Sequence, residues 1–311
     1  MERLSRLMLP MALVAISLSG IVDAAHAQQR FKSPDEAVTA LVTAVRANNV
    51  RDMIMVLGAE GRDIVVSGDD VADQTARAAF LIAYDLKHLV LKTGDNRADL
   101  VIGKNDWQLP IPLVQKGGVW QFDAVSGRRE VLFRRIGRNE LSAIQVVLAY
   151  VDAQSDYASM NPQGLKVDSY AHRIISSPGK KDGLYWPAAA NEPQSPLGEA
   201  FAAATIQGYR PGLEPAPYHG YRYKILTAQG PNAPGGTMNY VAKGNLIGGF
   251  GLVAYPAEYG NSGVMTFTVN HSGVVFQKDL GPNTAGIARR MTAFDPDPSW
   301  RRVDAKDLAR Q

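Results

Sequence analysis

The longest amphipathic pattern in this sequence runs from Asn139 to Met160. Its apolar positions recur at spacings of three and four residues and therefore share one helix face, which carries Leu141, Ile144, Leu148 and Val151. Asn139 is a good N-cap, because its side chain can accept hydrogen bonds from the first turn. Pro162 ends the pattern because proline lacks an N–H. The pattern predicts one buried helix over Asn139–Met160 that contributes to the cores of both halves of the chain.

The segment before this helix changes from helical to strand periodicity near residue 88. It begins with a capping box, Ser33-Pro34-Asp35-Glu36, in which proline occupies the first helical position. Three helices are predicted, at 33–47, Arg51–Leu57 and Val71–Asp85, the last packing through Ala72, Ala76, Ala79, Phe80 and Ala83. Short runs separated by turn signals then predict an antiparallel meander, with strands at His88–Lys92, Ala98–Ile102, Trp107–Val114 and Val119–Asp123.

The segment after Met160 is rich in loops until strand patterns return near residue 221. A hairpin is predicted where two apolar runs flank Asn270-His271-Ser272-Gly273, because a glycine-containing turn joins them. The predicted elements are a short helix at Gly198–Gln207, strands at Tyr221–Gln229, Leu246–Ala254, Gly263–Val269 and Gly273–Lys278, and a last helix at Thr284–Arg290. Helices combined with antiparallel sheets in both halves predict the fold class α+β.

The order of elements resembles two known architectures. Over Ser33–Phe122, helices followed by a meander resemble the nuclear-transport-factor-2-like cone, which implies a pocket between helix and sheet. We expect the candidate wall residues to belong to the core instead: Trp107, Trp120 and Phe122. In the second half, a long helix, a loop and a sheet resemble the headpiece of type IV pilins, through Phe267, Val269, Gly273, Val274 and Val275. The hydrophobic N-terminal spine of pilins is missing, so this domain should not polymerise through one.

The first 27 residues have the features of an export signal. Arg3 and Arg6 precede an apolar run over Leu7–Val22, and Ala25-His26-Ala27 has the small-residue spacing of a cleavage site. The run is short for a membrane-spanning helix and is interrupted by polar residues. We therefore expect a soluble periplasmic or secreted protein that starts at Gln28 and has no integral membrane segment. We expect an N-terminal unit at 28–138 and a second unit at 139–311.

The composition excludes several functional classes. The chain of 311 residues has no cysteine, which excludes disulfides, thiolate metal sites and cysteine nucleophiles. Its formal net charge of +3 is too small to indicate nucleic acid as a partner. We expect the densest basic run to form one solvated helix face, which would carry Arg128, Arg129, Arg134, Arg135 and Arg138. Anionic lipid or cell-wall polymer stays open as a partner of that face.

No motif in the sequence points to a cofactor, a metal or a nucleophile. Four histidines follow the export signal without zinc-site spacing: His88, His172, His219 and His271. Neither a phosphate-binding glycine loop nor a G-x-S-x-G motif is present. We therefore expect no cofactor and no metal. Asp295 and Asp297 carry oxygen ligands suited to calcium, but we expect them to form an Asp-Pro turn pair.

The best site candidates lie in two loop regions of the second half. His172 and His219 titrate near neutral pH, so either can act as acid or base with a carboxylate partner, for which Asp168 and Asp182 are the candidates. Aromatic side chains in the same loops can stack on a sugar or a peptide: Tyr185, Trp186, Tyr218 and Tyr221. The alternative is that the aromatics pack the loops and each histidine caps a turn, because no spacing forces these groups together.

Several longer stretches resemble an exported bacterial family, domain of unknown function 2950. They include IGRNELSAI at Ile136–Ile144, YVDAQSDYA at Tyr150–Ala158, SPGKKDGLYWPA at Ser177–Ala188, YHGYRYKILTAQGPNAPGG at Tyr218–Gly236, SGVMTFTVNHSGVVFQKDLG at Ser262–Gly281 and MTAFDPDPSW at Met291–Trp300. The resemblance covers most of the chain after the export signal. It implies a cell-envelope protein and transfers no catalytic residues.

Two functions stay open at this point. The first is a non-enzymatic binding or structural module of the envelope, whose partner is an envelope protein or a cell-wall polymer. We prefer it because catalytic motifs are missing. The alternative is a hydrolase or lyase that acts on cell-wall or polysaccharide material with a histidine–carboxylate site. Convergent groups with perturbed pKa values in a concave site would favour this alternative. The oligomeric state stays open.

Overall fold

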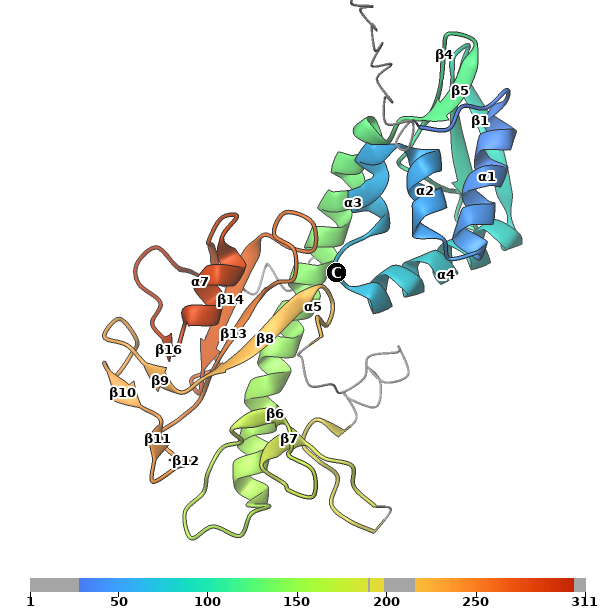
Figure 1. Cartoon of the computed structure of the whole chain (residues 1–311). Helices are drawn as coiled ribbons and strands as arrows, with labels where there is room; N and C mark the ends of the chain where they lie inside the picture. Colours follow the sequence, from blue (N-terminus) through green and yellow to red (C-terminus); the bar gives the residue numbers. More distant parts are fainter. Residues whose placement is uncertain (1–27, 190, 199–215, 305–311) are drawn as a thin grey trace, which may run out of the picture.

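The computed structural model describes residues 28–189, 191–198 and 216–304. One long helix, α5 (Ala124–Met160), runs through the molecule (Figure 1). Helices and a sheet from the N-terminal half lie along one side of its first part, and the C-terminal sheets lie beside its second part. Helices combine with mainly antiparallel sheets, as predicted for an α+β fold. The predicted helix Gly198–Gln207 lies, apart from its first residue, outside the described residues.

The predicted N-terminal helices are confirmed. In α1 (Pro34–Arg46), the Ser33 hydroxyl accepts from the Glu36 N–H at 3.1 Å, as a capping box requires. Helix α2 (Val50–Leu57) ends at Gly58, whose φ of 87° suits glycine. A short helix α3 (Arg62–Val65) leads to α4 (Asp70–Leu86). The predicted packing side of α4 is wrong in part, because Ala76 and Ala79 are exposed.

The predicted meander is present as an antiparallel sheet. Its strands are β1 (His88–Gly94), β2 (Arg97–Ile102), β4 (Leu113–Lys116) and β5 (Val119–Phe122), in the order β1-β2-β4-β5, with β3 (Trp107–Gln108) paired to β2. The predicted strand 107–114 is split, because Pro110 and Pro112 cannot donate to the ladder. Trp120 and Phe122 are core residues, as expected. Trp107 is not, since its two-residue strand leaves its side chain 41% exposed.

The central helix is longer than the pattern predicted. It begins at Ala124, where the Asp123 carboxylate accepts from the Ser126 N–H at 3.2 Å, and its 37 residues span about 55 Å. Asn139 is therefore not its N-cap. The Asn139 side chain instead donates to the Ser262 carbonyl at 2.9 Å, a partner 123 positions away. This tertiary contact, rather than a cap, explains why an asparagine stands at that position.

The arginine run does not form one solvated face. The Arg128 Nε donates to the Asp63 carboxylate at 2.9 Å. The Arg135 guanidinium donates to the carbonyls of Asp63 and Ile64, at 2.6 and 2.5 Å. These contacts fasten the first part of α5 to α3. Only the remaining arginines of the run are exposed, namely Arg129, Arg134 and Arg138.

The C-terminal half contains a five-stranded antiparallel sheet in the order β17-β15-β14-β13-β8. Its strands are β8 (Tyr221–Leu226), β13 (Gly251–Pro256), β14 (Met265–Asn270), β15 (Phe276–Asp279) and β17 (Arg301–Arg302). The predicted hairpin, formed by β14 and β15, and the predicted helix α7 (Thr284–Arg290) are both confirmed. Smaller ladders join β6 (Arg173–Ile175) to β7 (Gly183–Tyr185), β9 (Ala228–Gln229) to β10 (Met238–Asn239) and β16 (Ala293–Phe294), and β11 (Val241–Ala242) to β12 (Asn245–Leu246).

Two predicted strands of this half are interrupted. The pattern over 221–229 divides into β8 and β9 at Thr227. The pattern over 246–254 divides into β12 and β13 around Gly248 and Gly249. A Cβ on Gly248 would lie 3.0 Å from the Asn239 carbonyl oxygen, and Gly249 has a φ of 142°. Close backbone approach and this φ both require glycine, so the ladder ends here.

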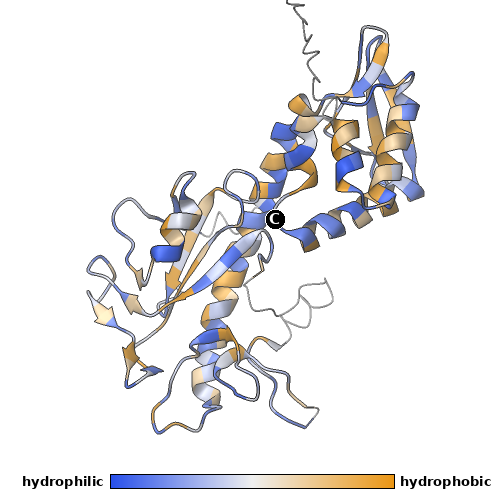
Figure 2. Cartoon of the chain, in the orientation of Figure 1, coloured by the Kyte–Doolittle hydropathy of each residue, from blue (hydrophilic) through white to orange (hydrophobic). Residues whose placement is uncertain are grey.

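The hydrophobic core is divided along α5. One cluster unites the N-terminal helices and sheet and ends at Ala124. Two further clusters belong to the C-terminal half, and Val147, Tyr150 and Tyr157 of α5 are at most 3% exposed within the larger of them. Figure 2 shows hydrophobic residues gathered on the middle part of α5, beside the sheet that holds β8, β13 and β14. Residues 139–160 thus pack only into the C-terminal core, and the earlier part of α5 packs against the N-terminal core.

Candidate binding site

A long groove follows one side of α5. Its α5 wall runs from Phe133 to Ala149, and its other wall comes from strands β14, β15 and β17 together with Tyr218 and His219. The groove has a volume of about 1050 Å³. Sixteen residue steps of helix correspond to about 24 Å. A recess of this length suits an extended ligand better than a compact one.

The groove carries positive charge. Three guanidinium groups line it, from Arg134, Arg138 and Arg301, against one carboxylate among the described residues, that of Glu140. One oxygen of Glu140 already accepts from the N–H groups of Val264 and Met265, both at 3.0 Å. The carboxylate is therefore held by the backbone that enters β14. Arg134 pairs with Glu130, and Arg301 lies 3.8 Å from Asp304, but both ion pairs are exposed and screened by water, so a ligand anion can compete for these arginines.

Tyr218 and His219 form an aromatic pair on the groove wall. Their ring centroids lie 4.1 Å apart. The next residue, Gly220, donates its N–H to the Asp69 carboxylate at 2.9 Å. A Cβ on Gly220 would lie 2.5 Å from the Asn139 Nδ2 atom, so only glycine fits between the two halves here. Asp69 therefore holds the turn that presents the aromatic pair, and the Asn139 side chain lies close against it.

The surroundings of His219 lower the pKa of its imidazole. Burial lowers the pKa of His219 below the ordinary histidine value, while the negative charge of Asp69 opposes this effect and the positive charge of Arg138 adds to it. The imidazole is therefore neutral at pH 7. A neutral imidazole offers one hydrogen-bond donor and one acceptor. It can bind a ligand hydroxyl or accept a proton from one.

A partly buried polar junction joins α5 and the N-terminal half to the loop before β14. The Arg135 Nη1 atom donates to the Asn261 side chain at 2.6 Å. Asn261 in turn donates to the Val66 carbonyl at 2.9 Å, which links the N-terminal half to the loop before β14. The partners in these bonds are 126 and 195 positions apart. Sequence patterns carry no signal for such pairs, so the junction could not be predicted.

The other predicted histidine lies away from the groove. The His172 Nε2 atom accepts from the Leu246 N–H at 3.2 Å. Burial lowers the pKa of His172, as does the positive charge of Arg173, while the negative charge of Asp182 opposes both; the lowered pKa favours the neutral ring that the bond requires. The residue before His172 is bound by Gln154, which lies fifteen positions beyond Asn139 on α5. That separation is about 22 Å along the helix axis, so the structure does not bring His172 and His219 together.

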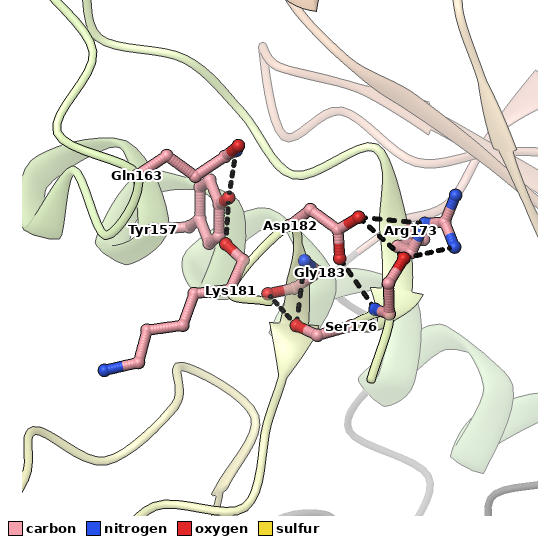
Figure 3. Close-up of polar contacts among 8 residues, drawn as sticks. Tyr157, Gln163, Arg173, Ser176, Lys181, Asp182 and Gly183 are labelled. Atoms are coloured by element: carbon pink, nitrogen blue, oxygen red, sulfur yellow. Dashed lines mark hydrogen bonds and ion pairs between the residues drawn. The ribbon is translucent and has the colours of Figure 1, made fainter. Parts of the chain in front are cut away.

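Asp182 is engaged in its own loop (Figure 3). Its carboxylate accepts from the Ser177 N–H at 2.7 Å and from the Ser177 hydroxyl at 2.8 Å, and the Arg173 Nε lies 3.8 Å away. Burial raises the pKa of Asp182, but the Ser177 hydrogen bonds and the Arg173 charge outweigh it and hold the pKa below the usual value. Asp182 therefore acts as an ionised anchor for the loop. Asp168, the other carboxylate candidate, is exposed in a loop.

The aromatic candidates divide between core and surface. Trp186 is 4% exposed and packs edge-on against Tyr157 at 6.3 Å. Tyr221 is fully buried and donates to the Met265 carbonyl at 2.9 Å. Both therefore contribute packing rather than surface. Tyr185 is half-buried on β7, and Tyr218 alone of the four lines the groove.

Asp295 and Asp297 are the two carboxylates whose oxygens would suit a calcium ion. Asp295 accepts from the Asn232 N–H at 2.8 Å, and Asp297 accepts from the Ser299 N–H at 2.8 Å. Asp297 thus holds a local turn, as expected for an Asp-Pro pair. Asp295 instead bonds to a loop 63 positions away, which is not the predicted Asp-Pro turn. Over the described parts of the chain, no three histidine, aspartate or glutamate side chains form a group suited to a metal ion. Over the same residues, no helix combines the length and apolar character needed to cross a bilayer.

The chain belongs to the family described as Protein of unknown function (DUF2950), which matches residues 28–303. The family expected from the sequence stretches above is therefore confirmed. No curated protein matches the chain, and no solved structure matches it. The resemblances to a nuclear-transport-factor-2-like cone and to a pilin headpiece stay predictions.

Proposed function

We propose that this chain is an exported cell-envelope protein that binds an acidic glycan in the groove beside α5. One observation carries the proposal: the groove combines three arginines with the Tyr218–His219 ring pair. Guanidinium groups bind carboxylates and phosphates through paired hydrogen bonds. An aromatic ring offers an apolar face with a polar edge, which suits a sugar ring. Of the two partner classes considered, these features favour a cell-wall polymer over an envelope protein.

The shape of the groove supports an extended polymer. It is about 24 Å long along α5, and it is open rather than enclosed. Gln145 and Gln277 line it and add amide groups that can pair with sugar hydroxyls. The ligand we propose is therefore a chain of several sugar units that carry acidic groups.

Export is part of the proposal. It rests on the basic residues, apolar run and small-residue cleavage site within residues 1–27. The test is to express the whole chain in a bacterial host and to determine the N-terminus of the product in the periplasm and medium. A mature product that starts at Gln28 is expected. A full-length product confined to the cytoplasm would contradict export.

The binding test uses the mature chain and two forms of one glycan. Oligogalacturonate carries a carboxylate on each unit, and its methyl-esterified form does not. We expect calorimetry to detect the charged form only, with an affinity that falls as salt is raised, because charge pairs are screened. Arg301→Ala should weaken binding, whereas Arg302→Ala, the same change on the adjacent residue outside the groove, should not. Equal binding of both glycan forms would contradict the proposal.

The hydrolase or lyase alternative is favoured by one observation. His219 lies on the groove wall, and the charge of Asp69 acts on it. A neutral histidine near a carboxylate can serve as a general base. Release of new sugar ends from oligogalacturonate, lost in His219→Gln while binding persists, would establish catalysis. Binding without any release of sugar ends would leave the chain a binding module.

A further inference from the structure

A second recess lies between α4 and α5 and reaches the residues of the N-terminal core. It is a cleft with a volume of about 370 Å³. Its walls are mainly apolar and come from helices α1 to α5 and strand β3, among them Leu41 and Val45 of α1, Phe80 of α4 and Val131 of α5. Small-molecule sites are typically concave and mostly apolar, with volumes from about 300 Å³ upward. This cleft is at the lower end of that range.

The mouth of the cleft is cationic. Arg77, Arg134, Arg135 and Arg138 line it, against one carboxylate among the described lining residues, that of Asp73. Asp73 is 6% exposed, and its carboxylate accepts from the Ser67 N–H at 2.9 Å. It is therefore turned into the protein rather than toward the opening. The acidic group of the lining does not cancel the positive charge at the mouth.

The arginines divide into anchored and available groups. Arg77 and Arg135 donate to backbone carbonyls of residues 63–65 and so belong to the scaffold. Arg134 is exposed and donates to Glu130, one helical turn away, an ion pair that water screens. Arg138 is exposed and makes no hydrogen bond or ion pair within the part of the chain that the structure describes. Arg134 and Arg138 are therefore available to bind a ligand anion.

We propose that the cleft binds a single-chain aliphatic carboxylate. The apolar walls suit a hydrocarbon tail, and the available guanidinium groups suit a carboxylate head. The small volume fits one chain rather than two. Trp107 stands among the lining residues with 41% of its side chain exposed, so an alkyl chain entering the cleft would cover it. This site is separate from the glycan groove, although Arg134 and Arg138 line both recesses.

The experiment uses the mature chain and 12-bromododecanoate, because bromine quenches tryptophan fluorescence on contact. We expect saturable quenching that falls sharply in Trp107→Phe, while calorimetry with the same variant still detects binding. Dodecyltrimethylammonium, which has the same tail and a positive head, should not bind. Arg138→Ala should weaken dodecanoate binding about tenfold or more. Arg129→Ala, an exposed arginine of the same helix outside the cleft, should leave it unchanged.

Two variants separate this proposal from the glycan proposal. Ala76→Trp fills the cleft from an exposed position on α4 and should abolish dodecanoate binding while glycan binding persists. Tyr218→Ala should weaken glycan binding while dodecanoate binding persists, because Tyr218 lines the groove and not the cleft. Circular dichroism checks that both variants are folded. Should Ala76→Trp fail to fold, the loss of quenching in Trp107→Phe provides the test, because Trp107 lines the cleft and not the groove. Equal binding of the cationic and anionic amphiphiles, or quenching unchanged in Trp107→Phe, would overturn the proposal.

Discussion

Asp69 links the start of α4 to the turn that carries Tyr218 and His219, and its removal gives the most direct test of this architecture. One carboxylate oxygen accepts from the Ala72 N–H at 3.0 Å and caps α4. The other accepts from the buried Gly220 N–H at 2.9 Å and holds the Tyr218–His219 turn. Asp69→Ala loses a cap, about 0.5–2 kcal/mol. It also leaves a buried donor unpaired, about 1–3 kcal/mol. Loss of a buried charge offsets part of this sum, so we expect a decrease of about 1–4 kcal/mol in the free energy of unfolding.

The assay is urea unfolding followed by circular dichroism, with Asp70→Ala as the matched control. Asp70 is exposed in the first turn of α4, so its removal should lose only a dipole interaction of about 0.3–1 kcal/mol. In folded Asp69→Ala, the loosened turn should also weaken oligogalacturonate binding, which Asp70→Ala should not. Equal destabilisation by the two variants would refute the assignment of Asp69 as the link between α4 and the groove.

Three further predictions concern α5 and the loop that it holds. Gly127→Ala should destabilise the protein, because the new Cβ would lie 2.6 Å from the Pro110 carbonyl oxygen. In the same helix, a Cβ on Gly137 would meet nothing within 4 Å, so Gly137→Ala should stabilise the protein by up to about 1 kcal/mol. Equal urea midpoints for the two variants would contradict this prediction. Gln154→Leu should lower the free energy of unfolding by about 2–5 kcal/mol, because it leaves the N–H and carbonyl of the residue before His172 unpaired; a change below about 0.5 kcal/mol would contradict it. Because burial lowers the pKa of His172, the unfolded chain binds more protons than the folded chain as pH falls. The stability contribution is thus complete above about pH 6.5 and is lost as pH falls through the lowered folded pKa, so the urea midpoint should fall between pH 7.5 and 5, and less so in His172→Gln.

Local signals were sufficient to predict most of the secondary structure. The capping box at Ser33, the stop at Gly58 and the limits of α7 were all predicted from neighbouring residues. Caps and turns act through hydrogen bonds that span only a few positions. Strand patterns worked where a ladder is regular, as in the β14–β15 hairpin. They failed at Thr227 and Gly249, where the chain changes partners.

The candidate sites were predicted only in part. Tyr218 and His219 are predicted from the sequence and line the groove. The predicted pairing of a histidine with Asp168 or Asp182 depends on distances that the sequence does not contain, and the carboxylate whose charge acts on His219 is that of Asp69. The arginines were expected to share one solvated face, yet Arg135 became scaffold while Arg138 stayed available at both recesses. The periodicity of a helix predicts which residues share a face. It does not predict which residues of other elements pack against that face.

The sequence by itself determined the helices, the meander, the hairpin and the predicted export signal, because each depends on propensities and bonds within a short segment. Tertiary structure alone decided where α5 begins and which of its residues are buried. Asn139 is a residue type that often caps the start of a helix, but its side chain donates to a carbonyl 123 positions away. The groove and the cleft are likewise made by segments that are distant in sequence. They exist because α5 packs between two cores that are assembled from different halves of the chain.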